Sequence, residues 1–208
     1  LRRMYELGVR MMTLTWNHEN ELASPQRNPG GVLVPQTEKG LTGKGFEFLA
    51  EMERLHMIVD VSHLSDKGFW DIVEHGTRPF AASHSNCRAL APHTRNLTDE
   101  MIRALSERGG IAGLNYYAPF LDTDPTHPEN CRSTVELIAK HAAHYKQVGG
   151  AQMIALGSDF DGIDGPHQLE NAAFLPLLAD ALRKEGFTED EVEGIYYRNA
   201  MRFFEENL

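Results

Sequence analysis

Three short motifs of this sequence end in side chains that could bind a metal ion or move a proton. They are DVSH at 60–63, ASHS at 82–85 and GSDFDG at 157–162. Each is a run of small and β-branched residues that reaches a histidine or an aspartate and then meets a turn. Parallel α/β proteins carry their chemistry at the carboxyl ends of such strands. The sequence therefore predicts a site assembled from several strand ends.

His63 and His84 are the candidate ligands of a zinc ion. They end strands that follow one another along the chain, so in a parallel sheet we expect their imidazoles to meet at the same edge. Zinc binds three or four nitrogen, oxygen or sulfur ligands, and this pair would supply about half of a site. One such histidine alone would more often be a satisfied core or loop residue. Two at equivalent strand ends, with an aspartate at a third, favour metal binding.

Two further side chains could take part in the chemistry. Asp159 could orient an attacking water beside a metal or pass its proton on, whereas Asp161, directly before a glycine, is better explained by a turn. Arg95 lies on the loop after the strand of His84 and could bind a carboxylate with two hydrogen bonds, although a surface arginine is the commoner case. Of the other histidines, His56, His75, His141 and His144 are predicted to be solvated, and His93, His127 and His167 lie in loops without an assigned role.

The elements that must position these residues alternate between strand and helix. Apolar runs predict five strands, at 9–15, 57–61, 79–83, 111–115 and 153–156. Helical periodicity and capping residues predict helices at 1–7, 43–55, 66–75, 98–108, 133–148, 170–185, 189–196 and 199–206. This alternation predicts an α/β fold with a parallel sheet and right-handed crossovers. The longest irregular segment, 24–42, is expected to be a substrate loop.

Composition narrows the class of protein. With 208 residues, 41% of them hydrophobic, the chain can form one buried domain over 1–208. Its 30 acidic and 20 basic residues argue against a nucleic-acid partner. Cys87 and Cys131 could form at most one disulfide, which favours a reduced, cytoplasmic protein. No apolar run approaches the ~20 residues that span a bilayer. The missing initiator methionine indicates a processed chain or a segment of a longer one.

Together these motifs resemble the zinc dipeptidases of the renal or membrane dipeptidase family, peptidase family M19. RNLTD at 95–99 and NAMR at 199–202 extend the resemblance, which runs over the whole chain. It implies a TIM-barrel (β/α)8 fold of the metal-dependent hydrolase type, with two zinc ions at its carboxyl face. It further implies that a dipeptide substrate is hydrolysed by a zinc-activated water.

The resemblance also implies individual roles. His63 and His84 would bind the second zinc, Arg95 would bind the terminal carboxylate of the substrate, and Asp159 would be the acid and base near the water. Many family members place a substrate-binding histidine directly after Leu-Thr. Trp16 stands there in this chain, and His18, two residues further, is the candidate to replace it.

The departures from the family are equally specific. The His-x-Asp motif that binds the first zinc and the glutamate that bridges both ions are absent from this chain. A (β/α)8 barrel typically takes about 250 residues, so the five strands would be strands four to eight of an incomplete barrel. Its open edges would favour a homodimer or aggregation. Two alternatives stay open: another amidohydrolase-like metal hydrolase, and an inactive remnant that acts only as a binding module.

Overall fold

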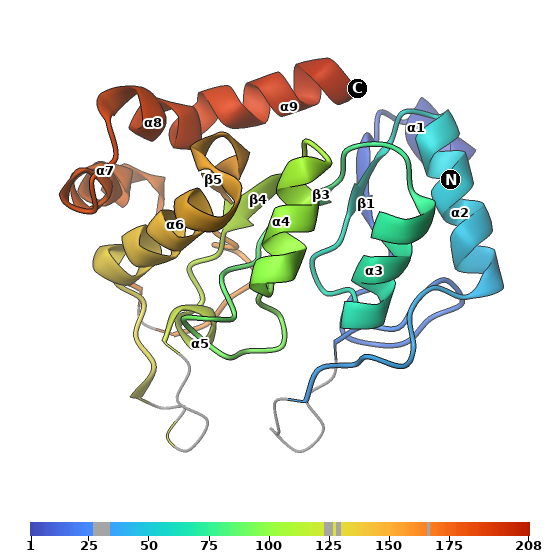
Figure 1. Cartoon of the computed structure of the whole chain (residues 1–208), viewed down its shortest axis with the longest axis horizontal. Helices are drawn as coiled ribbons and strands as arrows, with labels where there is room; N and C mark the ends of the chain where they lie inside the picture. Colours follow the sequence, from blue (N-terminus) through green and yellow to red (C-terminus); the bar gives the residue numbers. More distant parts are fainter. Residues whose placement is uncertain (27–33, 123–126, 128–129, 166) are drawn as a thin grey trace.

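The computed structural model describes residues 1–26, 34–122, 127, 130–165 and 167–208, and at its centre lies a parallel sheet (Figure 1). The strands are β1 (Met11–Thr13), β2 (Ile58–Asp60), β3 (Ala81–Ala82), β4 (Ile111–Leu114) and β5 (Ile154–Leu156). They pair in sequence order, and every pair is parallel. The predicted α/β fold is confirmed. All five strands lie where the apolar runs placed them, each shorter than predicted.

Helices precede and connect the strands, and four of them begin at polar caps. They are α1 (Arg2–Glu6), α2 (Gly43–Arg54), α3 (Asp66–His75), α4 (Asp99–Glu107) and α6 (Val135–Gly149), with the short α5 (Ala118–Leu121), which the periodicity did not predict. The side chains of Thr42, Ser65, Thr98 and Thr134 each accept a hydrogen bond from the backbone N–H three residues ahead. Such a cap satisfies one of the free N–H groups of the first turn. These caps fix where each crossover helix starts.

Alternate strand residues face two different layers, as the strand period of two requires. Val59, Ala82, Ala112 and Ile154 point to the helices and join the larger core, which includes Leu49, Met52, Phe69, Ile72, Ile102, Leu105, Ile138 and Tyr145. Ile58, Ala81, Ile111 and Ala155 point the other way and pack against Phe203. The sheet is therefore covered on both faces, which fits its nearly continuous apolar strands.

The C-terminal helices differ in detail from their prediction. The helix expected at 170–185 is α7 (Leu175–Lys184), preceded by the 3-10 turn η4 (Ala172–Phe174). Pro176 explains the late start, because proline is tolerated only in the first turn of a helix. The two helices expected beyond it form one continuous run, in which α8 (Glu189–Glu193), the π-helical η5 (Gly194–Arg198) and α9 (Asn199–Asn207) follow without a break.

The helix α9 lies across the amino ends of the strands, at the top of Figure 1. The Asn199 side-chain amide donates to the carbonyls of Ala151, in the 3-10 turn η3 (Ala151–Met153), and of Ile154, at 2.9 and 2.8 Å. Phe203 of the same helix packs against the sheet and closes this end. The carboxyl ends of the strands are left for a site. No helix in the described part of the chain combines the length and apolarity needed to cross a membrane.

One histidine predicted to be solvated is buried. His141 of α6 has no exposed surface; its Nδ1 accepts the backbone N–H of Cys87 at 3.0 Å, and its Nε2 lies 3.1 Å from the carbonyl oxygen of Leu121. The prediction was wrong because the apolar residues Ile138 and Ala142 share its helix face, and both ring nitrogens find partners there. His56 and His75 are exposed, as predicted.

The predicted substrate loop is described only in part, since residues 27–33 lie outside the described residues. Its two ends are held by isolated bridges, in which Ala23 pairs with Leu41 and Pro25 with Leu64. Gln26 donates to the buried carboxylate of Asp66. The loop is therefore anchored beside the segment that carries His63, and its role toward a substrate stays a prediction.

Candidate active site

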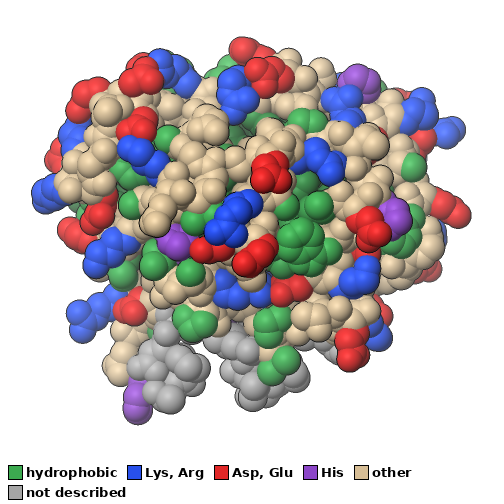
Figure 2. Space-filling view, viewed as in Figure 1, with side chains coloured by type: hydrophobic (Ala, Val, Ile, Leu, Met, Phe, Trp, Pro, Cys, Tyr) green, Lys and Arg blue, Asp and Glu red, His purple; other side chains and the backbone are tan. Residues whose placement is uncertain are grey.

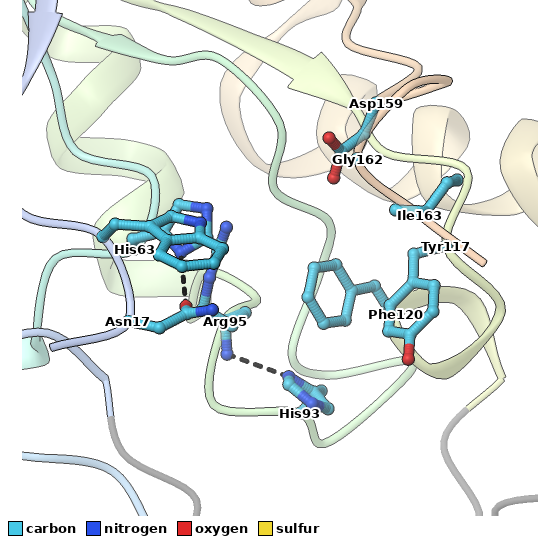
Figure 3. A pocket seen from close by; sticks show the side chains of 10 residues that line it. Asn17, His63, His93, Arg95, Tyr117, Phe120, Asp159, Gly162 and Ile163 are labelled. Carbon is cyan, nitrogen blue, oxygen red and sulfur yellow. Dashed lines mark hydrogen bonds between the residues drawn. The ribbon is translucent and has the colours of Figure 1, made fainter.

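The carboxyl ends of the strands surround a cavity of about 370 Å³ (Figure 3). His63 follows β2, Arg95 lies on the long loop after β3, and Asp159 follows β5. In the figure His63 and Arg95 lie on one side of the cavity and Asp159 on the other. The full lining consists of Trp16, Asn17, His63, His93, Arg95, Tyr117, Phe120, Asp159, Gly162 and Ile163. A second opening beside it includes His84 together with His63 and Asp159.

The two candidate ligands lie side by side. The Nε2 atoms of His63 and His84 are 2.8 Å apart, and their ring centroids are separated by 4.9 Å. The prediction that adjacent parallel strands bring these imidazoles together is confirmed. Their role as metal ligands stays a prediction.

The outward nitrogens of both imidazoles are held by polar side chains. His63 Nδ1 lies 3.0 Å from Asn17 Oδ1, an oxygen that accepts a hydrogen bond, and His84 Nδ1 lies 2.6 Å from Ser83 Oγ. With a proton on each Nδ1, as metal binding would require, both Nε2 atoms would present lone pairs to the same point. Metal-binding histidines in proteins are held in this way.

The geometry of the pair fits a shared cation. Zinc binds imidazole nitrogen at about 2.0–2.1 Å, so two such ligands on a tetrahedral ion lie roughly 3.3 Å apart. The 2.8 Å separation of the two Nε2 atoms is a hydrogen-bond distance, and it would have to widen by about 0.5 Å to reach that value. The pair supplies two of the three or four ligands that zinc takes. Among the described residues, the group of three metal-capable side chains within 4.8 Å of one another is elsewhere, at Asp71, Glu74 and His75.

Arg95 is a buried cation that is only partly satisfied. Its side chain is 8% exposed; Nη2 lies 2.9 Å from His84 Nε2, and Nη1 is buried without a hydrogen-bond partner among the described residues. Its guanidinium carbon lies 5.3 Å from the centre of the Phe120 ring. A buried donor without a partner is costly. The free N–H groups therefore favour binding of an anion such as a carboxylate.

Burial, helped by the nearby charge of Arg95, keeps both imidazoles neutral. Burial lowers the pKa of His63 to about 2, with smaller contributions from Arg95 and His84. Burial and Arg95 also lower the pKa of His84, against the opposing effect of Asp60 and Asp159. Burial lowers the pKa of Arg95 only to about 10, since the same two carboxylates stabilise its charge. At neutral pH the site therefore holds neutral imidazoles, the form that binds metals, beside a charged guanidinium.

Asp159 and His63 have strained backbones. Their φ angles are 64° and 74°, in the left-handed region that non-glycine residues rarely adopt. Such strain is concentrated at functional sites. Asp159 Oδ2 accepts a hydrogen bond from the Asn115 side chain at 3.1 Å, and a Cβ at Gly162 would lie 2.3 Å from its Oδ1. Asp161 is exposed, consistent with a turn role.

His18 does not join this group of side chains. It is exposed and lies outside the residues that line the cavity, and its ring centroid is 6.3 Å from that of Trp16. Its neighbours Trp16 and Asn17 line the cavity instead. The sequence also did not single out Tyr117 and Phe120, which form an aromatic wall. The available signal was that these two aromatic residues follow within six positions of the end of β4, at Leu114.

This fold and this group of side chains define an α/β protein with a candidate metal site at the carboxyl ends of its strands. The chain belongs to peptidase family M19, the membrane dipeptidases, whose sequence profile matches residues 1–207. The family resemblance read from the motifs is therefore confirmed.

Individual relatives agree with this membership. An uncharacterized protein of the pqqA 5′ region of Klebsiella pneumoniae is 37% identical over 204 residues, which are 97% of this chain and 73% of that protein. An uncharacterized dipeptidase of Schizosaccharomyces pombe is 35% identical over 204 residues, 97% of this chain and 47% of its own length.

Solved structures show the same fold. A metallo peptidase of Rhodobacter sphaeroides, solved with a phosphinate mimic of the dipeptide L-Ala-D-Ala, superposes with a TM-score of 0.90 at 32% identity and covers 100% of this chain. The metallo peptidase called dipeptidase AC superposes with a TM-score of 0.87 at 32% identity over 99% of this chain. The chain spans 58% and 60% of these two structures, respectively.

Proposed function

We propose that this chain carries the metal-binding and substrate-binding half of a zinc-dependent dipeptidase. The observation that carries the proposal is the pair of neutral imidazoles whose Nε2 atoms lie 2.8 Å apart, next to a buried, partly unpaired Arg95. The five strands would be strands four to eight of a (β/α)8 barrel. The coverage of the solved relatives, below two thirds of each, supports this assignment.

Each site residue of this chain would have a separate role in amide hydrolysis. His63 and His84 would hold the ion, which when bound lowers the pKa of a water molecule and polarises the scissile carbonyl. Asp159 would take the proton as the water oxygen bonds to the carbonyl carbon, and would deliver it to the amine nitrogen as the C–N bond breaks. Arg95 would bind the free carboxylate, so that only one residue fits beyond the scissile bond.

A cobalt titration of the chain tests the proposal. Cobalt(II) reports nitrogen ligation through its visible spectrum, and we expect His63→Ala and His84→Ala to abolish the band that the unmodified chain develops. His75→Ala is the matched control, because it removes an exposed histidine from the other metal-capable group, on α3, and should leave the band intact. A band lost in the control and kept in the two site variants would move metal binding away from this cavity.

A further inference from the structure

We propose that Asp60, acting through Ser83, is a positioning residue that holds the proton of His84 on Nδ1 and so keeps the lone pair on Nε2, the atom that would bind a metal. The inference rests on the proposed function, in which that Nε2 is a ligand. Asp60 does not line the cavity; it lies beneath it, at the end of β2. Its effect on the site must therefore pass through the residues it contacts.

Asp60 is a buried carboxylate with four hydrogen-bond donors. Its side chain belongs to a residue that is 3% exposed; Oδ2 accepts from Thr13 Oγ at 2.7 Å and from Ser83 Oγ at 2.6 Å. Oδ1 accepts from the backbone N–H groups of Ser62 at 3.0 Å and Ser83 at 2.9 Å. These donors come from the ends of β1 and β2 and from the segment after β3. An ionised carboxylate has enough lone pairs to accept all four of these hydrogen bonds.

The proton of the Ser83 hydroxyl can then go to one partner only. An ionised carboxylate cannot donate, so the 2.6 Å contact between Ser83 Oγ and Asp60 uses the serine proton. Ser83 Oγ also lies 2.6 Å from His84 Nδ1, and in this contact it can only accept. His84 must therefore carry its proton on Nδ1. In the neutral ring Nε2 then bears the lone pair.

A second contact independently requires the same tautomer. Arg95 Nη2 lies 2.9 Å from His84 Nε2, and a guanidinium has donors but no acceptor. The lone pair must therefore be on Nε2. His63 differs in this respect, because its Nδ1 faces the amide of Asn17, a group that can offer either an oxygen or an NH2 by rotation. Only His84 is connected to a fixed anion.

The connection from Asp60 through Ser83 to His84 is called the relay below. Asp60 also connects neighbouring strand ends, so a loss of stability in a variant would not show whether the relay exists. The tautomer of His84 is a direct readout, and two-bond 1H–15N correlations of the histidine-labelled, metal-free chain report it. We expect the Nδ1–H form in the unmodified chain, with the signal identified by its loss in His84→Gln. In Asp60→Asn the amide NH2 faces Ser83 Oγ and frees the serine proton for His84 Nδ1. With the competing Arg95 contact removed by Arg95→Ala, the signal should move toward the Nε2–H form.

Two further variants separate the relay from general damage. Ser83→Ala removes the hydroxyl and should also populate the Nε2–H form. Thr13→Val removes another hydrogen bond from the same oxygen of Asp60 and should leave the tautomer of His84 unchanged. If Asp60→Asn does not fold, Ser83→Ala carries the test. Because Arg95 donates to Nε2, each variant is compared in the Arg95→Ala background. An unchanged Nδ1–H form in a folded, metal-free Asp60→Asn or Ser83→Ala chain of that background would overturn the relay.

Cobalt affinity provides the second readout. Loss of an outer partner of a ligand typically weakens metal binding by about 10–100-fold, and we expect this loss in Asp60→Asn and Ser83→Ala. Ser83→Thr keeps the hydroxyl and should restore most of the affinity. Unchanged affinity in both loss variants would refute the positioning role. A chain that shows the tautomer shifts but binds no cobalt would overturn the proposed function and leave the proton relay standing.

Discussion

At the scale of single residues, the site contains a buried charge and strained backbone angles, features that cost stability unless a ligand uses them. Arg95 is a buried cation with one nitrogen unpartnered, and His63 and Asp159 adopt left-handed backbone angles. An unpartnered buried donor and left-handed backbone angles each cost the fold stability. Their combination in one cavity supports a binding role, because strain and unpaired donors persist where a ligand uses them.

The role of Arg95 can be tested by changing either the protein or the ligand. Lysine keeps the charge but loses the paired N–H donors, so Arg95→Lys should weaken binding of a dipeptide by about 10–100-fold, the value of a charged hydrogen bond. The C-terminally amidated dipeptide should bind the unmodified chain as weakly as the free acid binds the variant. Melting temperature should change little. Titration calorimetry measures both affinities, and an equal affinity for acid and amide would exclude carboxylate recognition.

At the scale of elements, the helix α6 contributes a buried histidine to stability. Burial holds the pKa of His141 at about 4, below its ordinary 6.5. Between those values the unfolded chain takes up a proton that the folded chain excludes. The free energy of unfolding must therefore fall as the pH falls through this window, and above it the effect is absent.

The size of this effect can be measured with a single variant. His141→Gln removes the titration, so its stability should change less between pH 7 and pH 4 than that of the unmodified chain, by up to roughly 3 kcal/mol. Part of the remaining slope belongs to His63, His84 and His93, whose pKa values are also lowered. Urea unfolding at several pH values gives the comparison. The exposed His75→Gln is the control, and a slope equal to that of His141→Gln would contradict the assignment.

The helix α9 is expected to stabilise one face of the sheet, the face of Ile58, Ala81 and Ile111, through a single side chain. Phe203 is fully buried against Ile58, Ala81 and Ile111, so Phe203→Ala should lower the free energy of unfolding by about 3–5 kcal/mol. Met201, on the same helix, is 51% exposed, and Met201→Ala should cost little. Chemical unfolding of both variants measures the difference. Similar losses would show that the helix contributes by its presence rather than by this contact.

At the scale of the whole molecule, the sheet has two open edges, β1 and β5. Acidic and basic side chains are interspersed on the face shown in Figure 2. Open strand edges can pair with another strand, and we propose that a second copy of the chain pairs here to form a homodimer. Sedimentation velocity should show a dimer whose fraction rises with concentration. A monomer at all accessible concentrations would exclude this assembly.

The chain as it stands should hydrolyse dipeptides poorly, even with added zinc. His63 and His84 are two ligands, whereas catalytic zinc sites hold about three from the protein. Asp159 would then have little activated water to serve. A zinc titration with a simple dipeptide, with His63→Ala as the blank, measures the activity. Robust turnover that disappears in the variant would show that further ligands in this chain complete the site.

Much of this arrangement could be predicted from local patterns. Short apolar runs that end in His63 and His84 indicated parallel strands, and the parallel sheet brought the two imidazoles together. Local patterns did not predict why glycine is required at positions 113 and 157. A Cβ at either position would lie 2.0 or 2.1 Å from the carbonyl oxygen of Ser83, a contact that exists only once three strand ends meet.

The sequence by itself determined the family, the order of strands and helices, and the strand ends that carry His63, His84 and Asp159. These features depend on residue types and on spacing over a few positions. Only the tertiary structure decided that Asn17, 46 residues away, holds His63, that Arg95 is buried, and that Asp60 reaches His84 through Ser83. Such contacts depend on where loops bring distant side chains, and no local periodicity encodes that placement.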